Sequence, residues 1–391
     1  MTSSPQIADP HADLPALRVA IRTWLRDHEA ELQPYRHEIV GDIPQMYTHV
    51  RPLQRMLCEA GWTRLGWPVE VGGLGGSAVM RAELMEEFAA AGYTFPDLLA
   101  TIEIMGPMLV KYAPELAAQH LPAAIAGDEV WCQGFSEPEA GSDLGGLRCK
   151  AVPTDGPNGP GFVLSGQKMW SSYGSISKRC CVLARTNDNG HRGLSMLWVD
   201  LDSPGVTMVP TMCETHRDDV SELFFDDVFV PLDRLVGPEG AGWEVVMYLL
   251  QYERGAYAWK RQAEMHTHLQ EVLHQADPVA AAAHTTAIGE AYLAIFALRS
   301  QAGPTLGLLD SGAALGPGIS IDKLLLGVAE QTITDTARNV LWPALELDDT
   351  EAAERWRRRW SYTRITTIYG GAAEVQRDLV AERLLGLPRG K

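Results

Sequence analysis

The chain has 391 residues, which is enough for two or three domains with a sizeable buried core. Apolar residues make up 46% and charged residues 21%, so a disordered or collagen-like polymer is excluded. The chain has 33 Lys and Arg against 50 Asp and Glu, which gives a net charge of −17. Because this charge repels phosphate backbones and anionic lipid, we expect no nucleic acid or membrane partner. The first residues lack a signal-peptide pattern and no apolar run approaches about 18 residues, which predicts a cytoplasmic location.

The cysteines form no C-x-x-C pair, and two of them are adjacent. This spacing suits neither a zinc site nor a disulfide framework. Since free cysteine is among the most buried residue types, we expect reduced core residues and no metal site. The six positions are Cys58, Cys132, Cys149, Cys180, Cys181 and Cys213.

The hydrophobic pattern divides the chain into three parts. Helical spacing runs from about 12 to 126, short β-rich runs separated by turns follow from about 131 to 230, and long helical stretches come after them. The sequence therefore predicts an α+β fold, with an N-terminal helical domain, a middle antiparallel β domain and a C-terminal four-helix bundle. We place the three domains at residues 1–130, 131–233 and 234–391. The C-terminal helices are expected at 241–275, 277–302, 318–343 and 374–386, with a Gly/Pro-rich loop at 303–318.

Residues 73–78, Gly-Leu-Gly-Gly-Ser-Ala, fit the loose pattern of a dinucleotide site, and Asp97 follows at about the expected distance. Only Val69, Glu70 and Val71 stand between Pro68 and the first of the glycines. This is too short for the strand that must precede the glycines in a β-α-β unit. We interpret the glycines as a tight turn before a helix that Ser77 caps.

Two polar segments are candidates for ligand contact. Residues 136–143 follow a predicted strand, and their Ser and Gly residues can turn hydroxyls and N–H groups toward a ligand, although an ordinary polar turn is equally compatible. Residues 165–172 end another strand and place Trp170 between polar residues, where the ring could wall an aromatic cofactor or serve only for packing.

With three further stretches, these segments make the chain similar, nearly end to end and in the same order, to the acyl-CoA dehydrogenase family. The first stretch contains Gly61-Trp62, Trp67-Pro68-Val69-Glu70 and Gly72-Gly73. The other two are the end of a strand, Asp227-Val228-Phe229-Val230-Pro231, and the tail Ile368-Tyr369-Gly370-Gly371-Ala372-Ala373-Glu374-Val375-Gln376-Arg377. The resemblance implies FAD bound between the β domain, the C-terminal helices and a second subunit. By matching position, Phe135, Ser136 and Ser142 would line the flavin and the thioester, Trp170, Ser171 and Ser172 would flank the isoalloxazine, and Gly371 and Glu374 would lie on its far side.

The departures from the family pattern concern the catalytic base. Many members carry a Glu directly after the Tyr of the tail, but Gly370 stands there in this chain. Other members carry the carboxylate on the first C-terminal helix before an Arg, which matches Glu253 and Arg254. Helical periodicity places both within the apolar stripe of that helix, where burial raises the pKa of a carboxyl and a neighbouring Arg opposes the rise. A structural Glu–Arg pair is the alternative.

Two stretches that hold the adenosine half of FAD in other members are absent near Arg299 and Trp342. A run of Arg and Trp at 355–360 could meet a phosphate of FAD, CoA or phosphopantetheine, or could be a solvated helix face with its Trp residues packed inward.

The resemblance implies an FAD-dependent dehydrogenase that makes an α,β-enoyl thioester. Glu253 would remove the α-proton, hydride would pass to flavin N5, and the thioester oxygen would be held partly by the N–H of Gly370. The substrate would be a branched or bulky acyl-CoA or a carrier-protein thioester, bound near Ser142 and Arg254. An electron-transfer flavoprotein would accept the electrons, and we expect a homodimer or homotetramer. The alternatives are a flavin monooxygenase on the same fold and a silent subunit of a hetero-oligomer.

Overall fold

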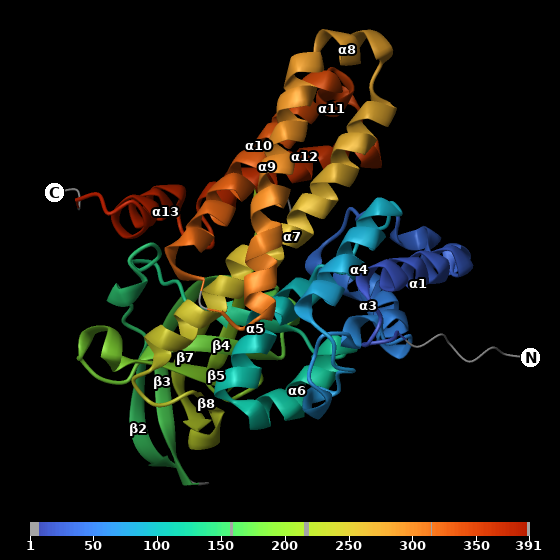
Figure 1. Cartoon of the computed structure of the whole chain (residues 1–391). Helices are drawn as coiled ribbons and strands as arrows, with labels where there is room; N and C mark the ends of the chain where they lie inside the picture. The colour runs from blue at the N-terminus through green and yellow to red at the C-terminus, as the bar shows by residue number, and fades with distance from the viewer. Residues whose placement is uncertain (1–7, 157–158, 215–218, 314, 389–391) are drawn as a thin grey trace, which may run out of the picture.

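The computed structural model describes residues 8–156, 159–214, 219–313 and 315–388. Figure 1 shows three parts: blue and teal N-terminal helices, a green β-sheet beside them, and a long orange and red helical bundle above both. The predicted order of helices, sheet and helices is confirmed. No helix among these residues has both the length and the apolar character to cross a membrane. Nor do their His, Cys, Asp and Glu side chains gather in threes that could hold a metal ion.

The N-terminal part is helical, as predicted, and its helices begin at sequence-encoded caps. The Asp13 carboxylate accepts a hydrogen bond from the N–H of Ala16, and Asp42 forms a capping box with Gln45. The helices then bury apolar faces in one core. Their bounds are α1 Leu14–Asp27, α2 Glu29–Leu32, α3 Ile43–Glu59, α4 Ala78–Ala90, α5 Leu98–Tyr112 and α6 Pro114–Ile125.

The turn at residues 73–78 leads into α4 without a β-α-β unit. Gly73 has no room for a side chain, since an added Cβ would stand 2.0 Å from the carbonyl oxygen of Trp67. Ser77 occupies the cap position of α4, but its side chain makes no capping hydrogen bond. The N–H of Ala78 donates instead to Oδ1 of Asp310 at 2.6 Å.

The middle part is a single sheet with strand order β6-β7-β3-β2-β4-β5-β8, and β1 pairs with β4 at one side. The sheet is mainly antiparallel, as predicted, but β4 pairs in parallel with both β1 and β2. Cys132, Cys149, Cys180 and Cys181 are buried in the sheet region, while Cys58 and Cys213 are partly exposed. The strands are β1 Trp131–Gly134, β2 Lys150–Gly156, β3 Gly159–Ser172, β4 Arg179–Arg185, β5 Leu194–Asp200, β6 Val206–Thr211, β7 Val220–Pro231 and β8 Leu235–Val236.

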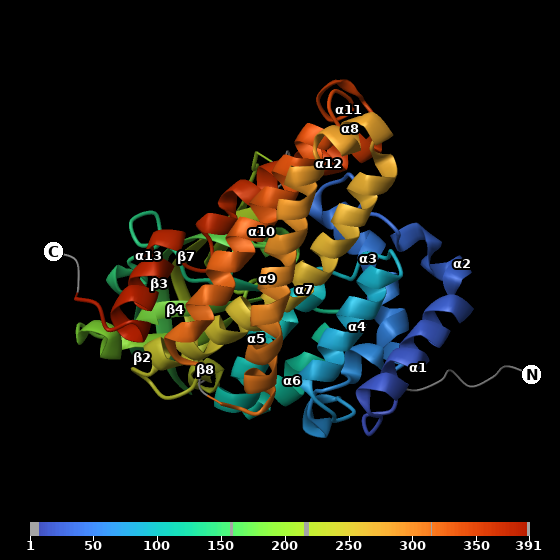
Figure 2. The ribbon, with the colours of Figure 1, turned by 45° about the horizontal axis from the view of Figure 1, so that its top comes forward.

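The C-terminal part packs long helices against one another (Figure 2). Its bounds correct the sequence prediction in two places. Residues 303–310 continue a helix through Pro304 and do not form a loop. The stretch at 374–386 is a short helix followed by a π-helical turn, and it packs against α10, as does α12, which is not among the expected helices. The helices are α7 Gly242–Gln275, α8 Pro278–Ala283, α9 Thr285–Asp310, α10 Ile319–Val340, α11 Ala344–Leu347, α12 Glu351–Thr363 and α13 Ala373–Leu379.

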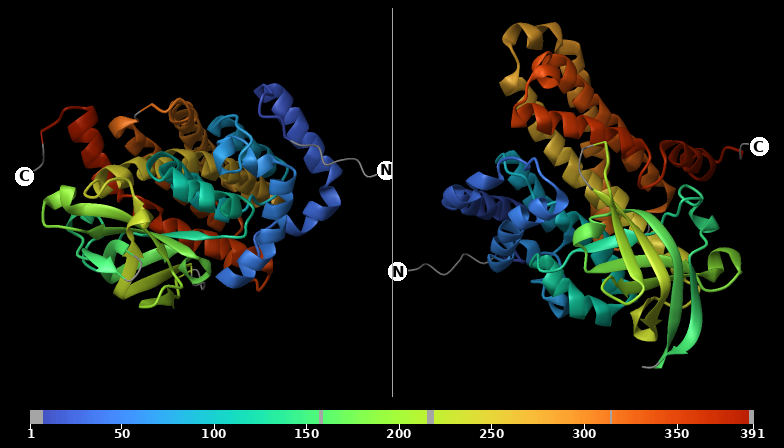
Figure 3. Two further views of the ribbon diagram at one scale, coloured as in Figure 1. Left: turned by 90° about the horizontal axis from the view of Figure 1, so that it is seen from below. Right: turned by 180° about the vertical axis from the view of Figure 1, so that it is seen from behind.

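The first turns of α7 join all three parts. Val245, Val246 and Leu249 are fully buried in the same core as the N-terminal helices and Trp198 of β5. Seen from below and from behind, α13 stands outside the bundle on the side of the sheet (Figure 3).

Candidate active site

Glu253 and Arg254 lie on α7, one turn after its fully buried first turns. Arg254 Nε donates a hydrogen bond to the carbonyl oxygen of Gly370 at 3.1 Å, across 116 residues of sequence. Gly370 has a φ of 62°, a left-handed conformation that glycine adopts without strain. The tail motif is thus fixed against the helix turn that carries the carboxylate.

Glu253 and Gly370 are neighbours in space. A Cβ atom built on Gly370 would lie 2.8 Å from Oε1 of Glu253. Burial raises the pKa of the Glu253 carboxyl, and the positive charges of Arg254 and Lys323 act in the opposite direction. The result is a carboxyl group with a raised pKa beside a stretch of backbone that carries no side chain.

Lys323 of α10 is the third charged group of this cluster. It is buried, its Nζ donates to the carbonyl oxygen of Thr366, and it lies 4.1 Å from the centre of the Tyr369 ring. Burial lowers the pKa of Lys323 to about 8, although Glu330 and Glu253 favour its charged form. Lys323 therefore ties the tail segment to α10 and brings a positive charge toward Glu253.

The loop after β1 forms a second cluster. Lys168 Nζ donates to Oε1 of Glu137 at 2.7 Å and to the carbonyl oxygen of Phe135 at 3.0 Å. Glu137 also accepts hydrogen bonds from the N–H groups of Arg148 and Cys149. The N–H of Met169 donates to the carbonyl oxygen of Ser136 at 2.9 Å. These contacts hold both ends of the polar loop against β3.

Trp170 stands at an irregularity of β3. The pairing of β3 with β7 shifts between Lys168 and Ser171, and Trp170 has a φ of 61°. Bulky residues rarely adopt this conformation, and bulges that turn a side chain outward are frequent at functional sites. The Trp170 side chain is 58% exposed at the end of the strand.

The three domain models of one family match the chain in order. Residues 14–128 match "Acyl-CoA dehydrogenase, N-terminal domain", residues 132–228 the middle domain and residues 240–385 the C-terminal domain. Acyl-CoA dehydrogenase IpdE1 of Mycobacterium tuberculosis is 36% identical over 389 residues, which covers 96% of this chain and 98% of the relative. This chain belongs to the acyl-CoA dehydrogenase family.

Solved structures agree with the family assignment. The structure titled "Tcur3481-Tcur3483 steroid ACAD" superposes with a TM-score of 0.80 at 25% identity and covers 98% of this chain and 100% of that one. A chain of the ChsE4-ChsE5 complex from Mycobacterium tuberculosis superposes with a TM-score of 0.78 at 28% identity, and the match covers 100% of this chain and 100% of that one. The protein is accordingly an oxidoreductase of the acyl-CoA dehydrogenase type.

The structure brings some predicted site residues of this acyl-CoA dehydrogenase together and separates others. Glu253, Arg254 and Gly370 form one cluster, and an added Cβ on Gly371 would lie 3.3 Å from Nη2 of Arg254. Ser171 is fully buried, unlike the exposed Trp170 and Ser172 on either side of it. Three predicted residues have no hydrogen bond or ion pair with the Glu253 cluster in the described part of the chain: Ser142 is exposed, Phe135 is buried, and Glu374 is an exposed partner of Arg377 at 3.5 Å.

The arginine run at 355–360 is occupied by contacts within the chain. Trp356 is packed inward, as the packing alternative proposed. Arg359 pairs with Glu271 at 2.8 Å, and Arg358 pairs with Glu354 at 3.0 Å. These partners support a structural role for the run over phosphate binding.

Sequence reasoning missed Glu137, Lys168 and Lys323. No spacing rule marks these three residues. The available signal for Lys168 was its place in a predicted strand, because a charged residue buried there needs a partner.

Proposed function

We propose that this protein is an FAD-dependent dehydrogenase that converts an acyl thioester to its α,β-enoyl thioester, with Glu253 as the general base. The observation that carries the proposal is the Glu253 carboxyl beside Gly370, with a pKa that burial raises. A base of raised pKa accepts a weakly acidic proton more readily near neutral pH. The family pattern places a catalytic Glu at one of these two positions, and this chain has its carboxylate at only one of them.

The residues present fit a flavin. Trp170 offers a flat exposed ring at a strand end, and exposed Ser172 lies two residues on. Near the tail, the side chain of Gln376 is fully buried against Gly371, and neither of its amide atoms has a hydrogen-bond partner among the described residues. Trp170, Ser172, Gly371 and Gln376 would hold FAD. When bound, FAD accepts the hydrogen that leaves the β-carbon as hydride.

The residues of this chain handle the proton and the thioester. Glu253 takes the α-proton onto its carboxylate. Arg254 holds the carbonyl of Gly370, and the N–H of Gly370 has no hydrogen-bond partner among the described residues, which leaves it available to the thioester oxygen as negative charge develops there. A backbone donor of this kind does not depend on a side chain at Gly370.

The acyl group is proposed to be branched or bulky, in line with the steroid dehydrogenase among the similar structures. The small residues near Glu253 contribute unequally to this proposal. Ala256 lines a cavity, whereas Gly255 packs against Leu309 and Thr305, and Ala258 is buried within the bundle core. CoA and carrier-protein thioesters both remain substrates in the proposal, and an electron-transfer flavoprotein is the proposed acceptor.

An anaerobic titration of the purified holoenzyme with acyl thioesters tests the proposal. A dehydrogenase bleaches its oxidised flavin directly on addition of substrate. A monooxygenase on this fold needs an external source of reduced flavin, and a silent subunit shows no bleaching at all. The titles of two similar structures each name two different proteins. The oligomeric state of this protein on its own is therefore measured by gel filtration before the titration, and we expect a homodimer or homotetramer.

A further inference from the structure

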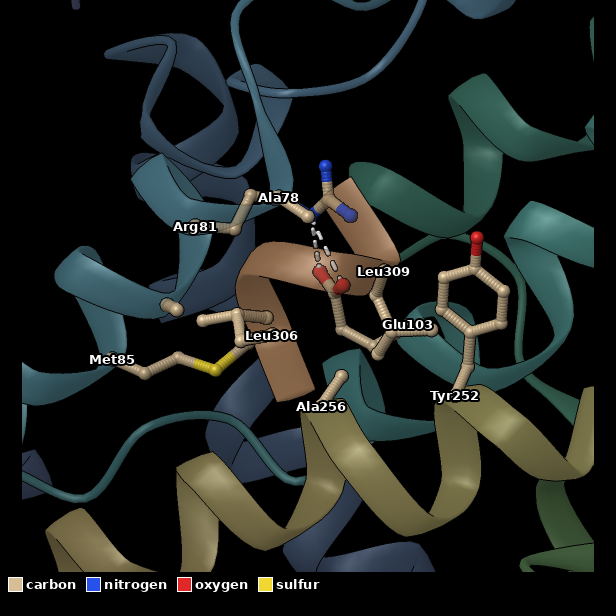
Figure 4. Close-up of a pocket in the computed structure, with 9 residues that line it drawn as sticks. Ala78, Arg81, Met85, Glu103, Tyr252, Ala256, Leu306 and Leu309 are labelled. Carbon is tan, nitrogen blue, oxygen red and sulfur yellow. Dashed lines mark hydrogen bonds and ion pairs between the residues drawn. The ribbon is translucent and has the colours of Figure 1, made fainter. Parts of the chain in front are cut away.

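A small cavity lies beside the turn of α7 that carries Glu253 (Figure 4). Its volume is about 10 Å³, which is room for a single water-sized group. Most of its wall is apolar or small, except for an Arg–Glu pair and a Tyr. The lining comprises Ala78, Arg81, Ala82 and Met85 of α4, Glu103 of α5, Tyr252 and Ala256 of α7, and Leu306 and Leu309 of α9.

Arg81 and Glu103 face each other in the wall of this cavity (Figure 4). Arg81 Nε donates to both carboxylate oxygens of Glu103, at 2.7 and 3.0 Å, and the two side chains are 7% and 11% exposed. The guanidinium also lies over the ring of Trp67, 4.1 Å from its centre. The pair is therefore held in place from two sides.

The pair retains unused hydrogen-bonding capacity. Arg81 Nη1 reaches the carbonyl oxygen of Leu65 only at 3.5 Å, and Nη2 has no hydrogen-bond partner among the described residues. Each Glu103 oxygen accepts from a single donor atom and can accept another hydrogen bond. One small polar group in the cavity could thus accept a hydrogen bond from Arg81 or donate one to Glu103.

Other ion pairs of α4 differ from this one. Arg18 with Glu83 and Arg22 with Glu87 join α1 to α4, and their arginines are 43% and 64% exposed. The Arg22–Glu87 pair borders a hollow on the side of α1, whereas the Arg81–Glu103 pair lines the cavity beside α7. A purely structural tie between α4 and α5 would not require a cavity at its free donors.

The cavity is close to the proposed base. Tyr252 and Ala256 both line it and flank Glu253 on α7, and the three residues from 253 to 256 advance about 4.5 Å along a helix axis. An acyl chain whose α-carbon lies at Glu253 can therefore bring an atom a few bonds further on to the cavity.

We propose that the acyl group of the substrate carries a neutral oxygen that binds at the Arg81–Glu103 pair at the end of the acyl site: a ketone that accepts a hydrogen bond from Arg81, or a hydroxyl that accepts from Arg81 and donates to Glu103. Because Glu103 already balances the charge of Arg81, a carboxylate in the cavity would meet a carboxylate, whereas a neutral oxygen would not. This inference rests on the proposed function, since it places the acyl group along α7.

Calorimetric binding to the Glu253→Gln holoenzyme tests the inference without turnover. The probes are hexanoyl-CoA, 5-oxohexanoyl-CoA and the mono-CoA thioester of hexanedioic acid. We expect the ketone to bind about 10- to 100-fold more tightly than the other two, as for a hydrogen bond to a buried charged group. Equal binding of hexanoyl-CoA and 5-oxohexanoyl-CoA would overturn the inference and leave the proposed function intact. Failure of all three to bind would overturn the inference, while flavin bleaching by other acyl thioesters in the anaerobic titration would still support the proposed function.

Two variants locate the preference in the pair. Arg81→Met with Glu103→Leu removes both charges and should bring the ketone preference to about 1. The matched control, Arg22→Met with Glu87→Leu, removes an ion pair of the same helix and should retain the preference. Glu103→Gln keeps the shape of the site but leaves Arg81 unbalanced, so the carboxylate probe should gain at least about 10-fold over the ketone. If Glu103→Gln leaves the order of the three probes unchanged, Arg81 does not contact the acyl group.

Discussion

A side chain on Gly370 would begin in direct contact with the carboxylate of Glu253, and one of the two groups would have to shift. The Cβ position of Gly370 is 2.8 Å from Oε1 of Glu253, which is closer than real Cβ atoms approach their neighbours. Two positions far apart in the sequence therefore lie side by side, and a carboxylate carried by either one would reach the same region. The glycine is as much a part of this arrangement as the glutamate.

This relationship predicts a partial exchange of the base. Gly370→Glu in a Glu253→Ala background should restore part of the flavin reduction that Glu253→Ala loses. Alanine is used because the longer side chain of Glu or Gln at 253 would collide with the new Cβ. Recovery should be incomplete, since a left-handed φ destabilises a non-glycine residue by about 1–2 kcal/mol. Stopped-flow flavin reduction measures the effect, and no recovery in a folded, flavin-loaded variant would contradict the shared position.

Lys323 should influence the pH dependence of flavin reduction. The general base must be deprotonated, so the rate rises with pH through the pKa of Glu253. The charge of Lys323 lowers that pKa, and its loss in Lys323→Met should move the acid limb to higher pH. Lys323→Arg keeps the charge and should keep the limb near its original position. An acid limb that does not move in Lys323→Met shows that the charge does not reach Glu253.

Trp170 is predicted to contribute to flavin retention more than to folding. Trp170→Ala should lower the ratio of flavin to protein after gel filtration, because it removes an exposed flat ring. Thermal unfolding of the flavin-free protein should change little, as for other surface substitutions. Trp170→Phe keeps an aromatic wall and should retain most of the flavin. Equal flavin content in all three proteins would assign Trp170 to the surface alone.

Lys168 is predicted to be a structural determinant of the polar loop. Lys168→Met leaves Glu137 buried without its partner, and loss of one member of a buried pair destabilises by about 3–5 kcal/mol. Urea unfolding measures the change. The exposed Lys178 lies in the same part of the chain as Lys168 and donates to the backbone carbonyl of Asp128, so it provides the control, and Lys178→Met should stay within about 0.5 kcal/mol of the native protein. Equal stability of the two variants would contradict the account of the loop.

Features with a local pattern could be predicted from the sequence. The helices of the N-terminal part and the strands of the sheet follow apolar periodicity and turn residues, and Glu253 lies on the apolar stripe of α7. The pattern does not place α12 among the expected helices and indicates a helix face only as one alternative for residues 355–360, because the segment is rich in charged residues. It predicts a loop at 303–310 because Gly303-Pro304 usually ends a helix. Packing of α9 against α7 and α10 outweighs that local tendency.

Features that depend on long-range contact could not be predicted from the residues. Lys168 and Glu137 are 31 residues apart, and Lys323 reaches the tail 43 residues later. Each of these residues acquires its role from a partner that only the fold brings near. The same is true of Arg81 and Glu103, which come from separate helices and become a candidate binding site only where α7 covers them.

The central claim is that Glu253 removes the α-proton of a thioester. Anaerobic titration of Glu253→Gln and of the native holoenzyme with the same acyl-CoA tests it most directly. The native flavin should bleach, and the variant should retain its flavin and bind the thioester while its reduction slows by at least about 10²–10⁴-fold. Reduction of the variant flavin at the native rate would show that the base lies elsewhere or that the reaction does not begin with removal of that proton.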